Sequence, residues 1–76
     1  DQKKIKSLKN RLSSTESDIA SLEKEIAAID HDLLMNYDAT IAKANFFDSY
    51  QKKKKNLESL MKTWENITLE LEEISL

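Results

Sequence analysis

The sequence predicts an all-α fold, a two-helix antiparallel coiled-coil hairpin, and two observations carry this prediction. Apolar residues recur at every third or fourth position through both halves of the chain, and the 76 residues include no Gly and no Pro, the residues that most often end helices. Each recurrence puts its members on one narrow stripe of a helix, the a/d seam that a coiled coil buries. Two stripes of similar length indicate two helices that pack on each other.

The first stripe predicts a helix over about residues 3–36, and the second predicts a helix over about 48–74. The first stripe consists of Ile5, Leu8, Leu12, Thr15, Ile19, Leu22, Ile26, Ile29 and Leu33. The second consists of Tyr50, Lys53, Leu57, Leu60, Trp64, Ile67, Leu71 and Ile74.

The turn is expected between about residues 37 and 47, because heptad positions there fall on Asn36, Thr40 and Lys43 instead of large apolar residues. Asp38 and Asp48 are candidate N-caps, and Asp48 has Gln51 three residues later, in capping-box spacing. The propensities of residues 39–43 permit some helix inside the turn.

Charge order favours the antiparallel arrangement. The first helix begins basic and becomes acidic, whereas the second begins with Lys52–Lys55 and ends acidic, so like ends would meet in a parallel dimer. The expected register sets Thr15 opposite Trp64 and Leu22 opposite Leu57. The same register brings two oppositely charged pairs near each other, Arg11 with Glu70 and Glu23 with Lys54. It also sets Lys53 against Ile26, which requires the lysine to snorkel outward.

Length and composition limit the functions that the chain can have. A single domain of residues 1–76 cannot enclose a catalytic cleft of ordinary depth, so we expect no enzyme activity from this domain and predict no catalytic, cofactor or metal site. His31 is the only histidine and falls on the outer face of the first helix. No apolar run approaches the roughly 20 residues of a membrane span, and the absence of Cys is compatible with the cytoplasm.

The chain also looks like part of a longer protein. It begins without Met, which suggests a piece of a larger chain. The apolar surface that two helices bury offsets only part of the entropy lost on ordering the chain, before hydrogen bonds and dispersion are counted, so the isolated hairpin should be marginally stable. We therefore expect it to dimerise or to be supported by a parent domain.

A lysine cluster beside aromatic rings is the strongest candidate site. Lysines neutralise phosphates and rings stack on exposed bases, so this combination is typical of nucleic-acid contacts. The predicted binding residues are Lys43, Lys52, Lys54, Lys55, Phe46 and Phe47. The alternative is that the aromatic rings only pack at the turn end of the hairpin and that the lysines pair with acids of the first helix. These acids are Glu23, Glu25, Asp30 and Asp32. A net charge of −2 excludes a general polyanion binder.

The turn and the second helix carry a resemblance to a known family. An aromatic pair, Phe46-Phe47, is followed by a lysine-rich segment at the start of the second predicted helix and then by Leu57-x-x-Leu60-Met61-x-x-Trp64-Glu65-x-Ile67. This pattern resembles the C-terminal coiled-coil domain of ABC-F ATPases, which include the Uup branch, over about residues 3–74. Ala44 stands where the family often has a proline before the turn aromatics.

The resemblance implies a parent protein that binds and hydrolyses ATP in two upstream cassettes, with no cofactor in this domain. It also implies that this hairpin binds DNA or helps to engage the ribosome, so the expected partners are nucleic acid and the parent ATPase domains. The rival interpretation is a structural or protein-binding hairpin, a spacer or oligomerisation arm. A third, the tRNA-binding arm of a synthetase, shares only the architecture.

Overall fold

A computed structural model describes residues 2–75 of the chain, and these residues form three helices: α1 (Gln2–Met35), α2 (Tyr37–Ile41) and α3 (Phe46–Ser75). Two residues of the predicted domain, Asp1 and Leu76, lie outside the described residues. The all-α class is therefore confirmed, but the prediction of two helices is corrected to three. The extra helix, α2, occupies the first part of the expected turn.

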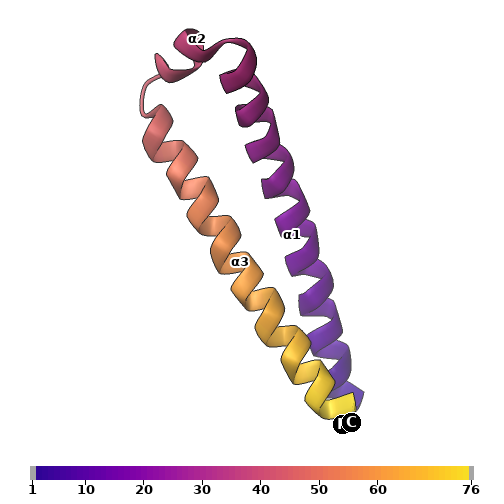
Figure 1. The fold of residues 1–76 in the computed structure, drawn as a ribbon. Helices are drawn as coiled ribbons and strands as arrows, with labels where there is room; N and C mark the ends of the chain where they lie inside the picture. The colour runs from indigo at the N-terminus through magenta and orange to yellow at the C-terminus, as the bar shows by residue number, and fades with distance from the viewer. Residues whose placement is uncertain (1, 76) are drawn as a thin grey trace.

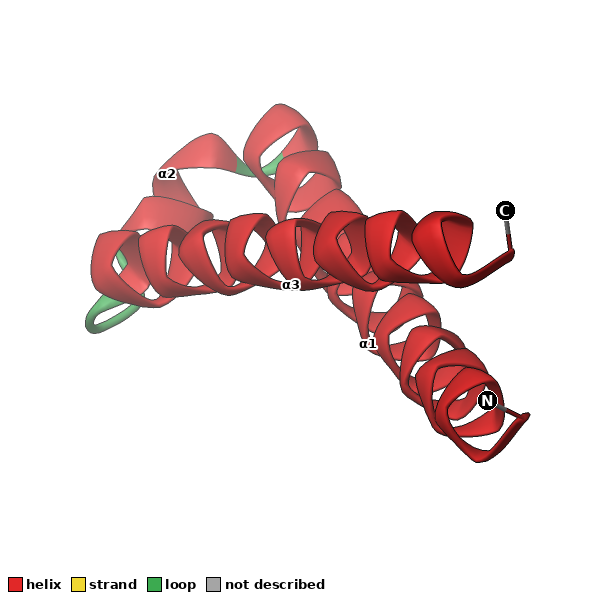
Figure 2. Ribbon diagram, turned by 90° about the horizontal axis from the view of Figure 1, so that it is seen from below, coloured by secondary structure: helices red, strands yellow, loops and turns green. Residues whose placement is uncertain are grey.

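The two long helices lie side by side and run in opposite directions, so the start of α1 and the end of α3 are both at the end of the molecule opposite α2 (Figure 1). Seen from below, they are inclined to each other (Figure 2). The molecule measures 54 × 17 × 16 Å. A helix of 34 residues is about 51 Å long, so α1 alone accounts for nearly the whole length. The fold is thus an elongated rod.

The predicted stripes face each other between α1 and α3. Leu8 and Ile67 are buried, with 4% and 2% of their surface exposed, and most other members of the two stripes are half-buried. Thr15 is also buried, and its hydroxyl donates to the carbonyl of Arg11 at 2.8 Å, so its polar group is satisfied within α1. Trp64 is the most exposed member, at 37%. Helix periodicity alone therefore identified the packed face.

Polar interactions between the long helices agree with the expected register. The indole Nε1 of Trp64 donates to Glu16 Oε2 at 3.3 Å, next to the expected partner Thr15. Lys53 Nζ lies 3.6 Å from Glu25 Oε1, which shows the predicted snorkelling away from the seam. The hydroxyl of Tyr50 donates to Asp30 Oδ1.

The two oppositely charged pairs that this register brings near each other form no ion pairs among the described residues. Neither Arg11 with Glu70 nor Glu23 with Lys54 is an ion pair among residues 2–75. All four side chains are exposed, where solvation competes with pairing.

The chain leaves α1 at Asn36, whose φ of −141° and ψ of 58° are not helical. The carbonyl of Asn36 then accepts the backbone N–H of Thr40 at 2.9 Å and its hydroxyl at 2.7 Å. Thr40 Oγ1 also lies 3.2 Å from the carbonyl of Asp32, in the last turns of α1. Thr40, which is 5% exposed, therefore holds α2 against the end of α1.

Helix α3 begins two residues earlier than expected. Asn45 has a positive φ of 58°, and its carbonyl accepts the N–H of Ser49 at 3.0 Å. This left-handed residue reverses the chain and lets the helix start at Phe46. Asp48 therefore lies inside the first turn of α3, and Asp38 inside that of α2, so neither is the predicted N-cap. Both carboxylates still interact favourably with the positive ends of their helices.

Candidate nucleic-acid interface

Three aromatic side chains at the start of α3 form one cluster. The ring of Phe46 meets the ring of Phe47 edge to face at a centroid distance of 5.2 Å, and meets Tyr50 in the same way at 5.7 Å. The bond from Tyr50 to Asp30 ties the cluster to α1. Edge-to-face geometry is the arrangement that aromatic rings prefer. The ring contacts and the bond to Asp30 together fix the position of the first turns of α3.

The two phenylalanines have different environments. Phe46 is half-buried and lines two hollows, one of about 170 Å³ with Thr40 and Lys43 and one of about 340 Å³ with Leu33 and Lys54. Phe47 is 61% exposed. A base can stack only on an accessible ring, so Phe47 is available for stacking and Phe46 mainly fills the space between the helices.

The predicted lysines do not all share one surface. Lys54 lines the larger hollow with Phe47, and its Nζ lies 4.5 Å from the centroid of the Tyr50 ring, a cation–π contact. At about 100° per residue, Lys54 lies about 20° around α3 from Phe47, and Lys55 lies about 80° from it. Lys52 lies about 140° away, on a different side of α3. Lys43 lines the smaller hollow, on the other side of Phe46.

Lys53 alone among Lys52–Lys55 forms an ion pair with an acid of α1, within the part of the chain that the structure describes. Lys43, Lys52, Lys54 and Lys55 are exposed and make no ion pair there. The alternative in which the lysines are neutralised by acids of the first helix therefore holds for Lys53 only.

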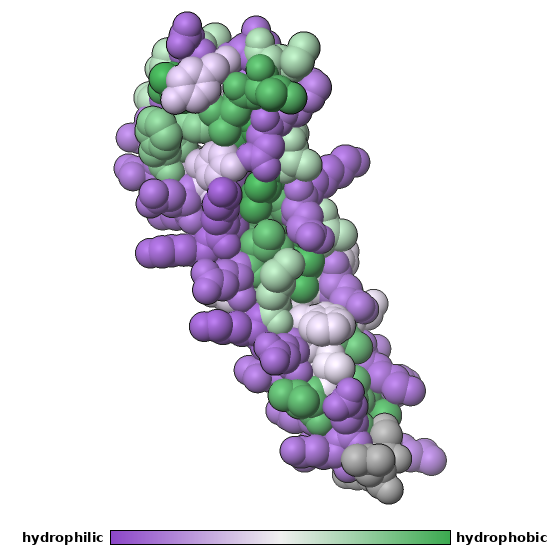
Figure 3. Space-filling view, in the orientation of Figure 1, coloured by the Kyte–Doolittle hydropathy of each residue, from purple (hydrophilic) through white to green (hydrophobic). Residues whose placement is uncertain are grey.

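Figure 3 shows hydrophilic side chains flanking the apolar strip between the helices, and apolar side chains gathered at the α2 end.

Gln51 is a site residue that the sequence prediction missed. It lines the larger hollow together with Phe47 and Lys54. Its spacing of four residues after Phe47 and three before Lys54 puts all three on one helix face, so this periodicity could have identified it. Phe47, Gln51 and Lys54, with Lys55 beside them, are hereafter called the Phe47 face.

Other functional groups are scattered. His31 is exposed on α1. Among residues 2–75, no three His, Cys, Asp or Glu side chains come close enough together to hold a metal ion. None of the helices formed by these residues combines the length and apolar character needed to cross a membrane.

Comparison of the chain with protein-family models, curated proteins and solved structures finds no match. The resemblance to ABC-F ATPases consequently stays a prediction from the residues that carry it.

Proposed function

We propose that this chain is an accessory module of a cytoplasmic ABC-F ATPase, in which α1 and α3 form an antiparallel coiled-coil hairpin and the α2 end contacts nucleic acid, either DNA or ribosomal RNA. The observation that carries the proposal is the Phe47 face, an accessible aromatic ring beside lysines that make no ion pair with described acids. ATP would be bound and hydrolysed by the parent cassettes, so this module would be non-catalytic.

The proposal rests on two kinds of side chain that lie on one surface of α3, cationic lysines and an exposed aromatic ring. Lys54 and Lys55 would contact phosphates, and Phe47 would stack on an unpaired base. The contact of Lys54 with the Tyr50 ring limits the freedom of its side chain, which lowers the entropic cost of binding. Lys52 and Lys43 flank the surface and would add weaker, longer-range attraction.

The experiment is a salt titration of binding to a 20-nucleotide single strand, followed by fluorescence anisotropy. The triple variant Lys52→Ala/Lys54→Ala/Lys55→Ala should bind more weakly than the wild type. The slope of the logarithm of its binding constant against the logarithm of salt concentration should be smaller by about 0.7–0.9 for each phosphate that is no longer neutralised. Phe47→Ala should weaken binding about 5- to 150-fold with an unchanged slope, because stacking contributes roughly 1–3 kcal/mol per base. Lys4→Ala/Lys6→Ala/Lys9→Ala is the matched control, since it removes three exposed lysines at the opposite end.

Two results would contradict the proposal. The first is an absence of binding by the wild-type chain at low salt. The second is an equal loss of affinity in the control triple variant, which would indicate unspecific attraction by charge.

A second candidate function, protein binding by the α2 end, is favoured by a separate observation. Leu34, Met35 and Tyr37 are 81%, 64% and 57% exposed at the junction of α1 and α2. Apolar side chains that gather on a surface are typical of protein contacts. If this candidate is right, amide hydrogen exchange at residues 34–37 should be slower in the full-length parent than in this chain alone. Equal exchange rates would argue against it.

A further inference from the structure

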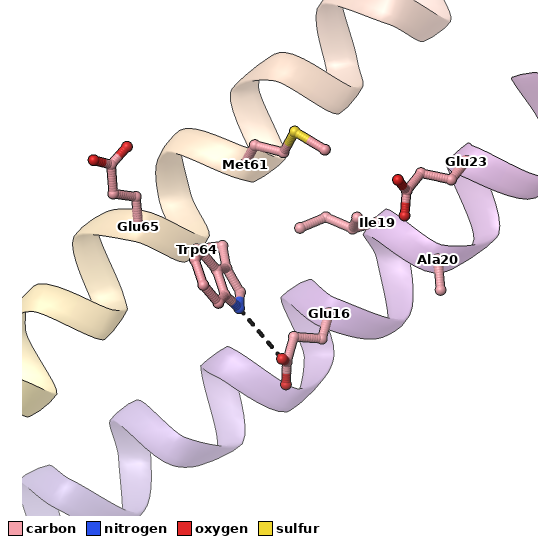
Figure 4. A pocket seen from close by; sticks show the side chains of 7 residues that line it. All are labelled: Glu16, Ile19, Ala20, Glu23, Met61, Trp64 and Glu65. Atoms are coloured by element: carbon pink, nitrogen blue, oxygen red, sulfur yellow. Dashed lines mark hydrogen bonds between the residues drawn. The ribbon is translucent and has the colours of Figure 1, made fainter.

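A groove on the side of the rod, distant from the α2 end, is not used by the proposed function. It has a volume of about 610 Å³ and lies between α1 and α3, lined by Ile19 and Ala20 of α1 and by Met61 and Trp64 of α3. Figure 4 shows Ile19 and Met61 extending into the space between the two helices, with the Trp64 indole directed toward Glu16. We call this surface the Trp64 groove.

The apolar part of the Trp64 groove is accessible. Trp64 is 37% exposed and Met61 is 45% exposed, although both belong to the helix that packs on α1. Met is an adaptable side chain, and Trp offers a large flat surface, so together they suit an apolar anchor from a partner. The indole is also oriented by its hydrogen bond to Glu16.

The rim of the groove is uniformly acidic. Among residues 2–75, the charged residues that line it are Glu16, Glu23 and Glu65, with no lysine or arginine. None of the three glutamates forms an ion pair among residues 2–75. A symmetric dimer through this surface would bring these carboxylates toward their own copies, and like charges at an interface disfavour association. The charges instead complement a basic partner.

We propose that the Trp64 groove binds a basic amphipathic helix, whose apolar residues contact Met61 and Trp64 and whose lysines or arginines pair with the three glutamates. A cation placed over the Trp64 ring would add a cation–π contact. A helix laid into a groove between two helices uses the anchor spacing of three, four and seven residues that this geometry favours. The proposal is independent of nucleic-acid binding, because it involves no residue of the Phe47 face.

The lone tryptophan of the chain makes the test direct, since its fluorescence reports on the groove. The probe is the basic amphipathic peptide acetyl-LKKLLKLLKKLLKL-amide, and its control is the same peptide with Glu in place of every Lys. We expect the basic peptide to shift Trp64 emission to shorter wavelength and to bind saturably, and the acidic peptide to do neither.

The variant Glu16→Gln/Glu23→Gln/Glu65→Gln should bind the basic peptide about 3- to 150-fold more weakly, since three exposed ion pairs contribute roughly 0.2–1 kcal/mol each. The matched variant Asp18→Asn/Glu70→Gln/Glu73→Gln removes three exposed acids outside the groove and should bind within about twofold of wild type. Circular dichroism would verify that both variants keep their helicity.

Three outcomes would overturn the proposal. One is a dissociation constant weaker than about 1 mM for the basic peptide at low salt. Another is equal weakening in the two triple variants. The last is a concentration-dependent blue shift of Trp64 without peptide, accompanied by dimers in sedimentation velocity, which would assign the groove to a second copy of this chain.

Discussion

Ile67→Ala is the most informative perturbation of the fold, because Ile67 is the largest fully buried side chain among the described residues, at 2% exposure. Replacing a buried Ile by Ala costs about 2–5 kcal/mol, and the cost depends on how far the surroundings collapse into the space. Two helices with few buried residues can collapse readily, so we expect the lower half of this range, about 2–3 kcal/mol. The better helix propensity of Ala offsets only about 0.4 kcal/mol.

The thermal midpoint should therefore fall by about 8–24 °C, since 1 kcal/mol corresponds to roughly 4–8 °C for a chain of this size. Circular dichroism at the helix minimum measures it. Leu69→Ala is the control, because Leu69 lies two residues away on α3 and is 51% exposed, so its removal should cost less than about 1 kcal/mol. Equal shifts for the two variants would refute the packing of α3 on α1 through Ile67.

Three further perturbations test individual interactions. Lys53→Met should leave the free energy of unfolding in urea unchanged or raise it by up to about 1 kcal/mol, because it replaces a partly exposed ion pair with apolar packing in the seam. A clear decrease would mean that the ion pair with Glu25 contributes more to stability than a partly exposed pair usually does. Thr40→Val should cost about 0.5–1.5 kcal/mol by removing the bonds of the hydroxyl to the carbonyls of Asn36 and Asp32. No change in the urea midpoint would show that these bonds do not hold α2. Asn45→Ala should lower the stability of the fold by about 1 kcal/mol and Asn45→Gly by less, because a left-handed φ disfavours a side chain that cannot hydrogen-bond locally. A lower thermal midpoint for the Gly variant than for the Ala variant would contradict the left-handed start of α3.

Much of the candidate site depended on features that no local pattern contains. The sequence placed Phe46 and Phe47 together as binding residues, but Phe46 is half-buried between the helices and only Phe47 is largely exposed. It also grouped Lys52, Lys54 and Lys55, where the helical repeat itself could have separated Lys52, which lies about 140° around α3 from Phe47. The Trp64 groove was missed altogether, because its acidic rim comes from both long helices and no single segment shows it.

By itself, the sequence determined the helical class and the two packed faces, because these follow from a repeat of three and four residues in a chain without Gly or Pro. Only the tertiary structure decided how the chain turns within the predicted segment 37–47 and which side chains remain free. Helix α2 exists because Thr40 bonds back to α1, and α3 begins at Phe46 because Asn45 adopts a left-handed conformation. Lys53 rather than its neighbours pairs with Glu25, because the crossing of two helices sets which lysine reaches which acid. Periodicity fixes the face that a helix buries, whereas exposure and pairing depend on distances between segments far apart in the chain.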